Sequence, residues 1–555
     1  MAAGASWLVG AAVLRVLRAA GVPGPAPGHP VTSVTILFGL CCITVLGGVW
    51  SLGAPLGPGA AVAGAAVLAL SATVLIFVPE RRLRAAPVSR MEKARFGLLV
   101  AVILVAAAQT ASSISVYDTS LYHIQAIRWI EQYPAVPGLA NLYDRLAFSP
   151  PWFEAQALFD PVLFGGRPVF ALNGLVFVAA VSFFLGGLRS PAGEQDLSRL
   201  LRLACVPAAF WLMRRWLSSA SPDVAVALIT WIVLLLLAEK IERGTGETLD
   251  QTAWVITALS SFAAVTKPSA AVLVLAPAWL IVRNLRATPR RALALAGLAA
   301  AVAAPFVVRN VIVSGCLIFP LPWTRLAWLS WAVPRKNVAA TLAAVEDWAR
   351  LPGSPHVSAL DAGRWIPGWL HRLTVVEWVF LAALPVLAAL HAVLALRRRG
   401  GSRPWPAGYP LLIALALAGS LFWLLTAPDP RFGWGSFPFL ALLLAVPLAA
   451  RWIGRLPGWA PVLLLTLVLI DQGRRVAAQD LPDLRSHWLW PVPPAAAETR
   501  SVNTGPLAVH LPVHGELCGD APLPCTPALD PAAVPRGTTF EEGWTTANTS
   551  AAPSE

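Results

Sequence analysis

Apolar segments of a length that can cross a membrane recur along almost the whole chain. A helix needs roughly 17–25 mostly apolar residues to span the hydrocarbon layer. About 13 or 14 stretches approach this pattern, near residues 5–20, 31–53, 58–79, 96–114, 168–188, 200–217, 224–239, 252–266, 268–282, 292–308, 374–395, 408–427, 434–450 and 457–471. The short pair 252–266 and 268–282 can also form a broken or re-entrant hairpin. Because 57% of the residues are hydrophobic and only 13% are charged, the sequence predicts an all-α integral membrane protein.

The distribution of basic residues predicts the orientation of the chain. Arg15 and Arg18 follow the first apolar segment, whereas a cleavable signal peptide carries its basic residues first. We therefore expect a retained helix with its N-terminus outside. If successive loops then lie on alternate sides of the membrane, more than half of the 42 Lys and Arg lie on the inner side. Fewer than a third of the 29 Asp and Glu lie there. Short loops rich in Lys and Arg, such as 81–84, 283–291 and 397–403, stay in the cytoplasm.

This orientation defines three regions and the side on which each lies. Residues 1–93 form N-terminal transmembrane helices, and residues 94–475 form a transmembrane core with outer loops 115–167 and 309–373. Residues 476–555 form an extracytoplasmic tail. The protein is then a multi-pass cell-membrane protein in contact with membrane lipids, and its net charge of +13 requires no nucleic-acid partner. Tryptophans in the second outer loop suit either a membrane-interface belt or stacking on sugars.

Two cysteines of the tail, Cys518 and Cys525, predict a local disulfide. They lie seven positions apart in a polar, proline-rich segment, and an oxidising exterior favours disulfide formation. Two free thiols are the alternative. A structural zinc site would need a second cysteine pair nearby, which the sequence lacks.

One carboxylate, Asp118, stands just beyond the apolar segment 96–114, where a membrane helix emerges. An ionisable group at a membrane boundary is a functional candidate. Asp118 can act as a general base toward an acceptor hydroxyl, or it can merely cap a following surface helix. His123, about one turn further on, can assist this chemistry or make only a structural hydrogen bond.

A second carboxylate, Asp223, is predicted at the same membrane level. It follows Ser221 and Pro222 in a turn between two apolar segments, a pattern that also suits a plain helix start. Two acids at one depth can share the activation of an acceptor, and a divalent metal bound through oxygen ligands is possible. Two carboxylates are too few to predict a metal site.

Three basic residues are predicted near the same outer boundary. Lys267 interrupts a long apolar stretch, Arg309 ends an apolar segment, and Arg431 lies between Pro430 and Phe432. Together they can bind the phosphate of a lipid, because the guanidinium fork matches phosphate oxygens. Lys267 can instead extend its ammonium toward the head groups. Asp429 is expected to orient Arg431 or to cap the next helix.

These motifs resemble the GT-C superfamily of multi-spanning membrane glycosyltransferases. The similarity covers roughly residues 94–540 and includes Tyr117–His123, Pro137–Asn141, Pro428–Phe432 and the tail cysteines. It implies a GT-C-like bundle with interfacial helices in its outer loops. It also implies transfer of a sugar, usually with inversion, from a polyprenyl-phosphate-linked donor to a cell-envelope glycan, lipid or protein acceptor on the outer face.

The superfamily's functional residues match this chain at three positions. Asp118 matches the catalytic acid of the first outer loop, Asp223 the second outer acid, and Lys267 the lysine of a Thr-Lys turn. Two features depart from the superfamily pattern: three extra helices precede the acid, and a single Asp stands where a paired acidic motif is usual.

Two other classes of function remain open from the sequence. One is a flippase or transporter for a glycolipid or polysaccharide, and the other is a catalytically inactive scaffold with the same fold. A transporter places its ionisable residues near the bilayer midplane, in broken helices. Here most ionisable residues collect at the outer boundary, which favours the glycosyltransferase.

Overall fold

The computed structural model describes residues 1–24, 31–78, 89–159, 170–189, 197–357, 362–397, 408–453, 455–487, 491–495 and 497–547. The predicted basic stretch 81–84 and most of 397–403 lie outside these residues. Every predicted apolar segment contains a bundle helix: α1 (Ala2–Ala19), α2 (Val31–Ser51), α3 (Pro58–Phe77), α4 (Arg90–Ala111), α7 (Leu172–Phe184), α8 (Leu197–Met213), α9 (Asp223–Glu242), α10 (Gln251–Thr266), α11 (Leu275–Asn284), α12 (Pro289–Ser314), α15 (Val375–Arg397), α16 (Tyr409–Thr426), α17 (Phe437–Ile453) and α18 (Ala460–Gln479).

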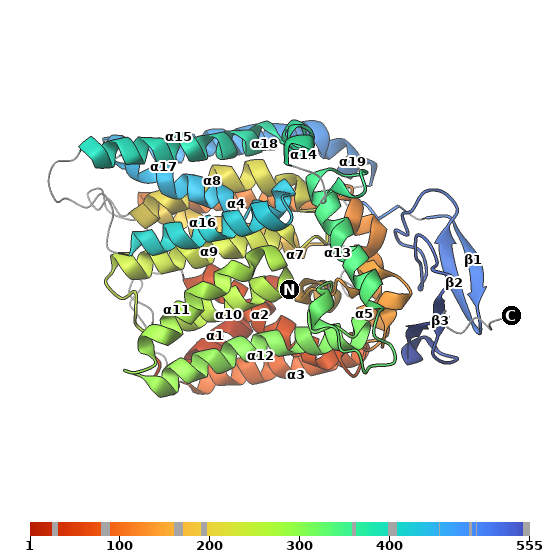
Figure 1. Ribbon diagram of the computed structural model, residues 1–555. Coiled ribbons are helices and arrows are strands. Elements are labelled where there is room, and N and C mark those ends of the chain that lie inside the picture. The colour runs from red at the N-terminus through yellow and green to blue at the C-terminus, as the bar shows by residue number, and fades with distance from the viewer. Residues whose placement is uncertain are drawn as a thin grey trace.

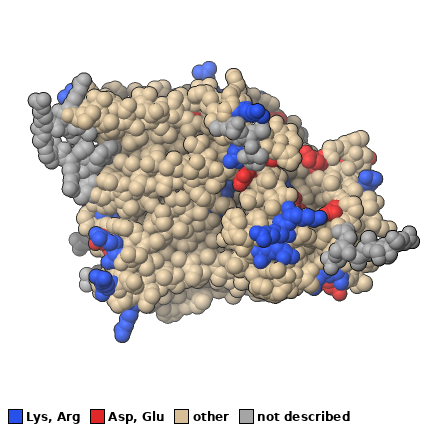
Figure 2. All heavy atoms as spheres, in the orientation of Figure 1, with Lys and Arg blue, Asp and Glu red and all other residues tan. Residues whose placement is uncertain are grey.

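Most of these helices run along one common direction and form a single bundle (Figure 1). Eight of the described helices are long and apolar enough to cross a membrane: α1, α2, α3, α4, α9, α12, α15 and α16. In Figure 2 a broad surface without Lys, Arg, Asp or Glu covers the middle of the bundle on the face shown. The prediction of a helical, multi-pass membrane protein is confirmed.

Helix α9 lies at the centre of the bundle. All its residues from Asp223 to Lys240 are buried, and a helix that is apolar on every side is expected in a core. It packs against α7, α8, α10 and α16. The indole of Trp231 donates a hydrogen bond to the carbonyl of Trp434, at 2.9 Å. Helix α9 therefore holds these neighbouring helices in place around its first residue, Asp223.

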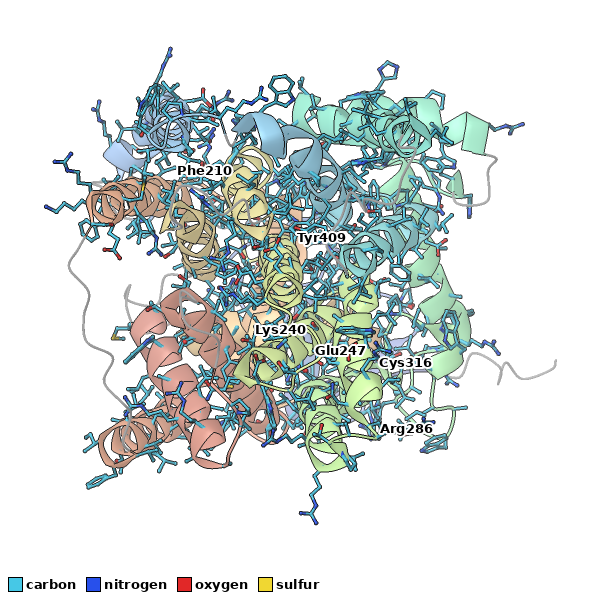
Figure 3. All side chains as sticks on the ribbon, turned by 90° about the vertical axis from the view of Figure 1, so that its left-hand side faces the viewer. Phe210, Lys240, Glu247, Arg286, Cys316 and Tyr409 are labelled. Carbon is cyan, nitrogen blue, oxygen red and sulfur yellow. A yellow bond between two sulfur atoms is a disulfide. The ribbon has the colours of Figure 1, made fainter. Side chains whose placement is uncertain are left out.

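Loops predicted on the same side of the membrane meet at the same end of the bundle. At one end the amide of Gln251 donates to the carbonyl of Pro23, at 2.9 Å, and Arg291 donates to the carbonyl of Gly21, at 2.9 Å. Figure 3 looks along the helices from this end, where Lys240, Glu247 and Arg286 lie. At the other end the amide of Gly138 donates to the carbonyl of Ile312, at 2.9 Å. The loops therefore alternate between the two ends of the bundle, as the predicted topology requires. Which end faces the cytoplasm stays a prediction.

The short apolar pair forms a hairpin that is broken at Lys267. Helix α10 ends at Thr266, and the chain returns through η6 (Pro268–Val274) and α11. Lys267 has an extended backbone, with φ −152° and ψ 130°, because the residue before a proline is driven out of the helical region. The break places the Lys267 side chain at the end of α10.

The outer loops contain short helices that cover one end of the bundle. The first loop holds η1 (Thr119–His123), α5 (Ile124–Gln132), η2 (Leu139–Asn141), η3 (Asp144–Ala147) and α6 (Pro151–Phe159), and the second holds η7 (Pro322–Thr324), α13 (Arg335–Arg350) and α14 (Ala362–Arg372). Helix α13 crosses the bundle direction (Figure 1). The second loop starts later than predicted, because α12 continues to Ser314. Helix α5 is mostly buried, unlike the surface helix that its amphipathic sequence predicted.

The C-terminal tail folds against the first outer loop. It contains α19 (Leu481–Ser486), η10 (Phe540–Glu542) and two antiparallel two-stranded sheets, one of β1 (Thr499–Thr504) with β2 (Leu507–Pro512) and one of β3 (Ala533–Pro535) with β4 (Trp544–Thr546). The sequence had not predicted these strands. Trp544 is fully buried, and its amide donates to the carbonyl of Pro137, at 2.9 Å. The predicted disulfide joins Cys518 and Cys525, whose Cα atoms lie 5.8 Å apart.

Cysteine labelling tests the predicted orientation. Ala287, between α11 and α12, and Ser501, in β1, are both exposed and belong to opposite ends of the bundle. Ser501→Cys should react with a membrane-impermeant maleimide in intact spheroplasts, and Ala287→Cys should react only after permeabilisation. The parent protein gives the background, since its free Cys41, Cys205 and Cys316 are buried and Cys42 is half-buried. Labelling of Ala287→Cys from outside would reverse the topology.

Candidate functional site

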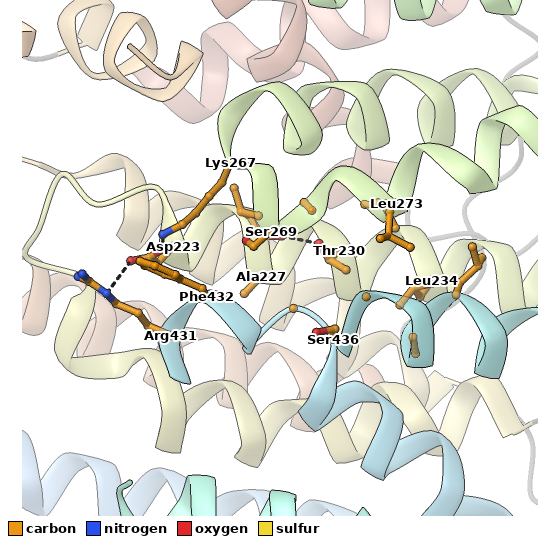
Figure 4. Close-up of a pocket in the computed structure, with 17 residues that line it drawn as sticks. Asp223, Ala227, Thr230, Leu234, Lys267, Ser269, Leu273, Arg431, Phe432 and Ser436 are labelled. Carbon is orange, nitrogen blue, oxygen red and sulfur yellow. Dashed lines mark hydrogen bonds and ion pairs between the residues drawn. The ribbon is translucent and has the colours of Figure 1, made fainter. Parts of the chain in front are cut away.

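Two acids and two bases from distant parts of the sequence meet at the outer-loop end of the bundle. Arg431 Nη1 lies 2.8 Å from Asp118 Oδ2, and Arg431 Nε lies 3.8 Å from Asp223 Oδ2. Lys267 Nζ pairs with the other carboxylate oxygen of Asp223. Figure 4 shows Lys267, Asp223 and Arg431 converging in this way. We call these four residues the ionic cluster.

Asp118 enters the cluster from the first outer loop, just before a π-helical turn. The turn η1 follows it directly, and π-turns are frequent at functional sites. Asp118 makes no side-chain capping hydrogen bond, so the N-cap interpretation is wrong and its carboxylate pairs with Arg431 instead. Burial disfavours the charged form of Asp118, but the guanidinium of Arg431 outweighs burial and holds the pKa of Asp118 below its ordinary 3.8. Asp118 is therefore ionised at neutral pH.

Asp223 is the most deeply buried acid of the cluster. Its side chain is 2% exposed, and it is the first residue of α9, directly after Pro222. Ser221 Oγ donates a hydrogen bond to Asp223 Oδ2, at 2.9 Å. A buried carboxylate requires paired charges and hydrogen-bond donors, and Lys267, Arg431 and Ser221 together provide them.

The turn that carries Arg431 is held by indole groups. Asp429 and Arg431 alternate with prolines ahead of α17, in η9 (Pro430–Gly433). Trp369 Nε1 donates to the carbonyl of Pro428, at 2.5 Å, and Trp423 Nε1 donates to the carbonyl of Asp429, at 2.7 Å. These contacts fix the backbone directly before Pro430 and so aim Arg431 at the two acids.

Asp429 orients Arg431 and also caps its turn, as the sequence predicted. Asp429 Oδ1 lies 3.4 Å from Arg431 Nε and accepts a hydrogen bond from the Arg431 amide, at 3.2 Å. Asp429 Oδ2 lies 3.4 Å from Arg372 Nη2. Burial disfavours the charged guanidinium, but Asp429, Asp118 and Asp223 outweigh burial and raise the pKa of Arg431 above its ordinary value.

His123 is buried next to the cluster and does not bind it directly. Its Nδ1 lies 3.3 Å from Thr119 Oγ1, and its ring packs against Tyr122 and Phe153. Burial lowers the pKa of His123 from 6.5 to about 4. The ring is therefore neutral at pH 7 and has the packing of a structural residue.

Arg309, which the sequence grouped with Lys267 and Arg431, is held by a different set of residues. Its Nε lies 2.7 Å from Ser149 Oγ and 3.4 Å from Glu154 Oε1, and its Nη1 lies 3.1 Å from Ser51 Oγ. These contacts join α12 to α2 and α6. The structure therefore brings together Asp118, Asp223, Lys267 and Arg431, and it places Arg309 in a separate buried ion pair.

An apolar groove leads away from the ionic cluster between α9, η6, α16 and the turn 431–436 that precedes α17. The free space inside it is about 30 Å³, and about 510 Å³ when the open solvent at its mouth is included. Asp223, Lys267 and Arg431 lie at one end, and Leu234 and Leu273 lie at the other (Figure 4). Small residues such as Ala227, Ala416 and Gly435 also line it. Val274 and Leu275, which follow the lining residue Leu273, are exposed. The groove therefore borders the lipid-facing side of the bundle.

The charges of the cluster are balanced by protein side chains. Among the described residues, no group of three or more His, Cys, Asp and Glu is arranged to hold a metal ion. Arg431 occupies the space between Asp118 and Asp223 that a bridging cation would need. The two acids therefore have the geometry of a guanidinium site, and their use as joint metal ligands would require Arg431 to move.

Aromatic rings at the cluster were not predicted from the sequence. Lys267 Nζ lies 3.6 Å from the centre of the Phe432 ring, and the Arg431 guanidinium lies 5.3 Å from that of Trp216. Cations over aromatic faces are stabilised by the ring quadrupole, most strongly where water is excluded. Phe432 adjoins Arg431 in the sequence and belongs to the motif Pro428–Phe432, but the sequence analysis assigned it no role. Trp216 had no sequence signal that tied it to the cluster.

Comparison with known proteins gives a family and a distant structural likeness. No curated protein matches the chain. The structure of arabinosyltransferase EmbB from Mycobacterium smegmatis is similar over 70% of this chain and 33% of that chain, with 15% identity and a TM-score of 0.37. The chain thus spans about a third of the length of that protein, and a likeness of this size does not establish a shared function. A family model matches residues 3–438, which is most of the chain, and the protein belongs to the family described as a domain of unknown function (DUF8201).

Proposed function

We propose that this protein is a membrane glycosyltransferase that moves a sugar from a polyprenyl-phosphate-linked donor to a cell-envelope acceptor on the outer face. The observation that carries the proposal is the ionic cluster at the head of an apolar groove. A lipid-linked phosphate needs cations at head-group depth and an apolar path for its chain. Lys267 and Arg431 offer the first, and the groove between α9 and α16 offers the second.

The two cations retain donors for a phosphate while they hold the acids. An ammonium carries three N–H donors and a guanidinium carries five. The ion pairs of Arg431 within the described residues use Nη1 and Nε, and Nη2 is left for a ligand. Lys267 and Arg431 can then stabilise the negative charge that develops on the phosphate as the donor bond breaks.

Asp118 is the group proposed to accept the proton of the acceptor. The acceptor hydroxyl oxygen attacks the anomeric carbon, the bond from that carbon to the phosphate oxygen breaks, and the phosphate keeps the electron pair. The hydroxyl proton passes to the carboxylate of Asp118, whose side chain is 21% exposed and so within reach of an acceptor. Asp223, 2% exposed, is a positioning residue that holds Lys267 and Arg431.

The positions of the charges favour this activity over transport. In α9 the charged residues are Asp223 at the start and Glu239, Lys240 and Glu242 at the end, and the residues between Asp223 and Glu239 carry no charge. A transporter is expected to place its ionisable groups near the bilayer midplane, in broken helices. The break at Lys267 lies at the outer-loop end of the bundle instead.

Asp118→Asn should abolish most of the activity without unfolding the protein. General-base catalysis contributes roughly 10²–10⁴-fold, and the turnover of sugar transfer should fall by about that factor. Arg431 keeps Asp223 and Asp429 as partners, so its charge is not left unpaired. The assay is transfer from polyprenyl-phosphate-sugar donors into membrane acceptors at matched protein level.

Asp144→Asn is the matched control for this experiment. Asp144 also lies in the first outer loop, where its carboxylate accepts a hydrogen bond from Thr341 Oγ1, at 2.8 Å. It should retain normal turnover. If Asp118→Asn is as active as Asp144→Asn, Asp118 is not the base.

The pH dependence of the reaction follows from the two lowered pKa values. The pKa of Asp118 lies below 3.8 and that of His123 is about 4, so Asp118 is charged and His123 neutral at every higher pH. The value of kcat/KM, which reports ionisations of the free enzyme, should therefore stay level between about pH 5 and pH 8. A rise in kcat/KM centred near pH 6.5 would show that His123 titrates during catalysis.

A bulky residue in the groove should discriminate donors by the length of their chain. Ala416 lines the groove, whereas its neighbour Leu417 is exposed. Ala416→Phe should raise the KM for a long polyprenyl donor more than the KM for an analogue with one or two isoprene units, because only the longer chain needs the blocked space. Leu417→Phe is the control and should change neither KM. Equal effects of Ala416→Phe on both donors would remove the groove from the donor site.

A further inference from the structure

A loop of the C-terminal tail reaches the segment that carries Asp118. This loop, residues 516–525, which we call the latch loop, contains the Cys518–Cys525 disulfide. The amide of Gly519 donates to the carbonyl of Ser120, at 2.7 Å. Ser120 belongs to the π-helical turn η1, two residues after Asp118. The tail is thus bonded to the backbone beside the proposed base.

Gln125 binds the latch loop at two points. Its Nε2 donates to the carbonyl of Ala521, at 2.8 Å, and its Oε1 accepts from the amide of Cys525, at 3.2 Å. Gln125 is 1% exposed. A buried amide that satisfies both its donor and its acceptor on one loop fixes that loop strongly, because an unmade buried hydrogen bond is costly.

Arg128 and Tyr117 extend this contact in both directions. Arg128 pairs with the carboxylate of Asp520, and its Nη1 donates to the carbonyl of Ala521, at 3.0 Å. Tyr117, the residue before Asp118, donates its hydroxyl hydrogen bond to Glu516. The latch loop therefore contacts the segment 117–128 on both sides of Asp118 and His123.

The disulfide gives the latch loop the shape that these contacts require. Cys518, Ala521 and Cys525 form a small buried cluster of their own, and Leu523 packs against the neighbouring core of the first outer loop. Gly519 has a positive φ of 49°, and a Cβ there would lie 2.5 Å from the carbonyl oxygen of Ala495. Without the disulfide, the carbonyls of residues 519–521 lose the restraint that aims them at Gln125 and Arg128.

We propose that the latch loop holds Asp118 in position, so that the site is complete only while Cys518 and Cys525 are bonded. Gln125 and Arg128 act as positioning residues for Asp118 through the backbone of η1. This inference rests on the proposed function for its effect on turnover, and its structural part stands on the contacts alone. The catalytic segment then works fully only on an oxidising side of the membrane.

The test compares the full-length double variant Cys518→Ala/Cys525→Ala with the parent protein in lipid nanodiscs. Hydrogen exchange of the amides in 117–128 should become faster, because the tail groups that hold the Ser120 carbonyl and the Gln125 and Arg128 side chains are no longer fixed. The kcat of sugar transfer should fall by about 10- to 100-fold, the effect expected of a small misplacement of a catalytic group. The KM for the donor should stay the same, since Lys267 and the groove are untouched.

Cys316→Ala is the matched control, because Cys316 is a buried free cysteine of the other outer loop. It should change neither hydrogen exchange in 117–128 nor kcat. Unchanged exchange in 117–128 of the double variant would overturn the latch, whatever happens to activity. Faster exchange with a rise in donor KM instead of a fall in kcat would also overturn it, since general loosening of the site would explain both.

Two further measurements separate the latch from the proposed function. A dithiol reductant should reproduce the faster exchange in the parent protein and add nothing in the double variant, and an equal effect on both would contradict the latch. If even the parent protein transfers no sugar, the proposed function fails. The exchange measurements still decide whether the latch exists.

Discussion

The contact of Arg431 with both Asp118 and Asp223 is the interaction on which the outer end of the protein depends. It joins the first outer loop, the start of α9 and the turn before α17, which together span more than 300 positions of the sequence. Loss of one partner of a buried ion pair typically costs about 3–5 kcal/mol, because the other charge is left without compensation. Three carboxylates would face one another without Arg431, so we expect this residue to be required for the fold of the site as well as for its proposed chemistry.

The rest of the structure places this contact at the end of a lipid-facing groove. Helix α9 carries Asp223 because its apolar residues are buried on every side, and the break before Pro268 turns Lys267 toward the same point. Small residues such as Gly435 let the turn before α17 approach α9 closely: a Cβ on Gly435 would lie 3.2 Å from Thr230 Oγ1. Charge and apolar space thus meet where a phosphate attached to a lipid chain would need both.

Much of the fold could be predicted from the sequence, because the membrane imposes a simple physical rule on segment length. The apolar segments, the hairpin at Lys267 and the Cys518–Cys525 bond follow from residues that are close in the chain. Asp118, Asp223, Lys267 and Arg431 could be placed at one membrane level, since each stands at the end of an apolar segment. Depth along the membrane normal is therefore encoded locally.

The position of a residue within the membrane plane is not encoded by its neighbours in the sequence. The predictions that were wrong concern this position. Arg309 ends an apolar segment in the sequence, but it lies inside α12, where helix packing directs it to Glu154 and Ser149. Asp118 precedes a helical turn like an N-cap, yet the partner that takes its carboxylate lies in η9. The tryptophans divide in the same way, because Trp369 is buried as a hydrogen-bond donor while Trp323 is 70% exposed. The tail strands could not be predicted, because they are only three to six residues long. The elements against which the tail packs, η1 and α5, are also some 400 positions away in the sequence.

The most direct test of the account is a cryo-electron microscopy structure of the protein in lipid nanodiscs with a bound polyprenyl-phosphate-sugar. The account predicts the phosphate within hydrogen-bond distance of Lys267 and Arg431, the first isoprene units between α9 and α16, and the sugar facing Asp118. Lipid phosphate bound at another place on the bundle, with Lys267 and Arg431 still closed on Asp223 and Asp118 alone, would contradict it.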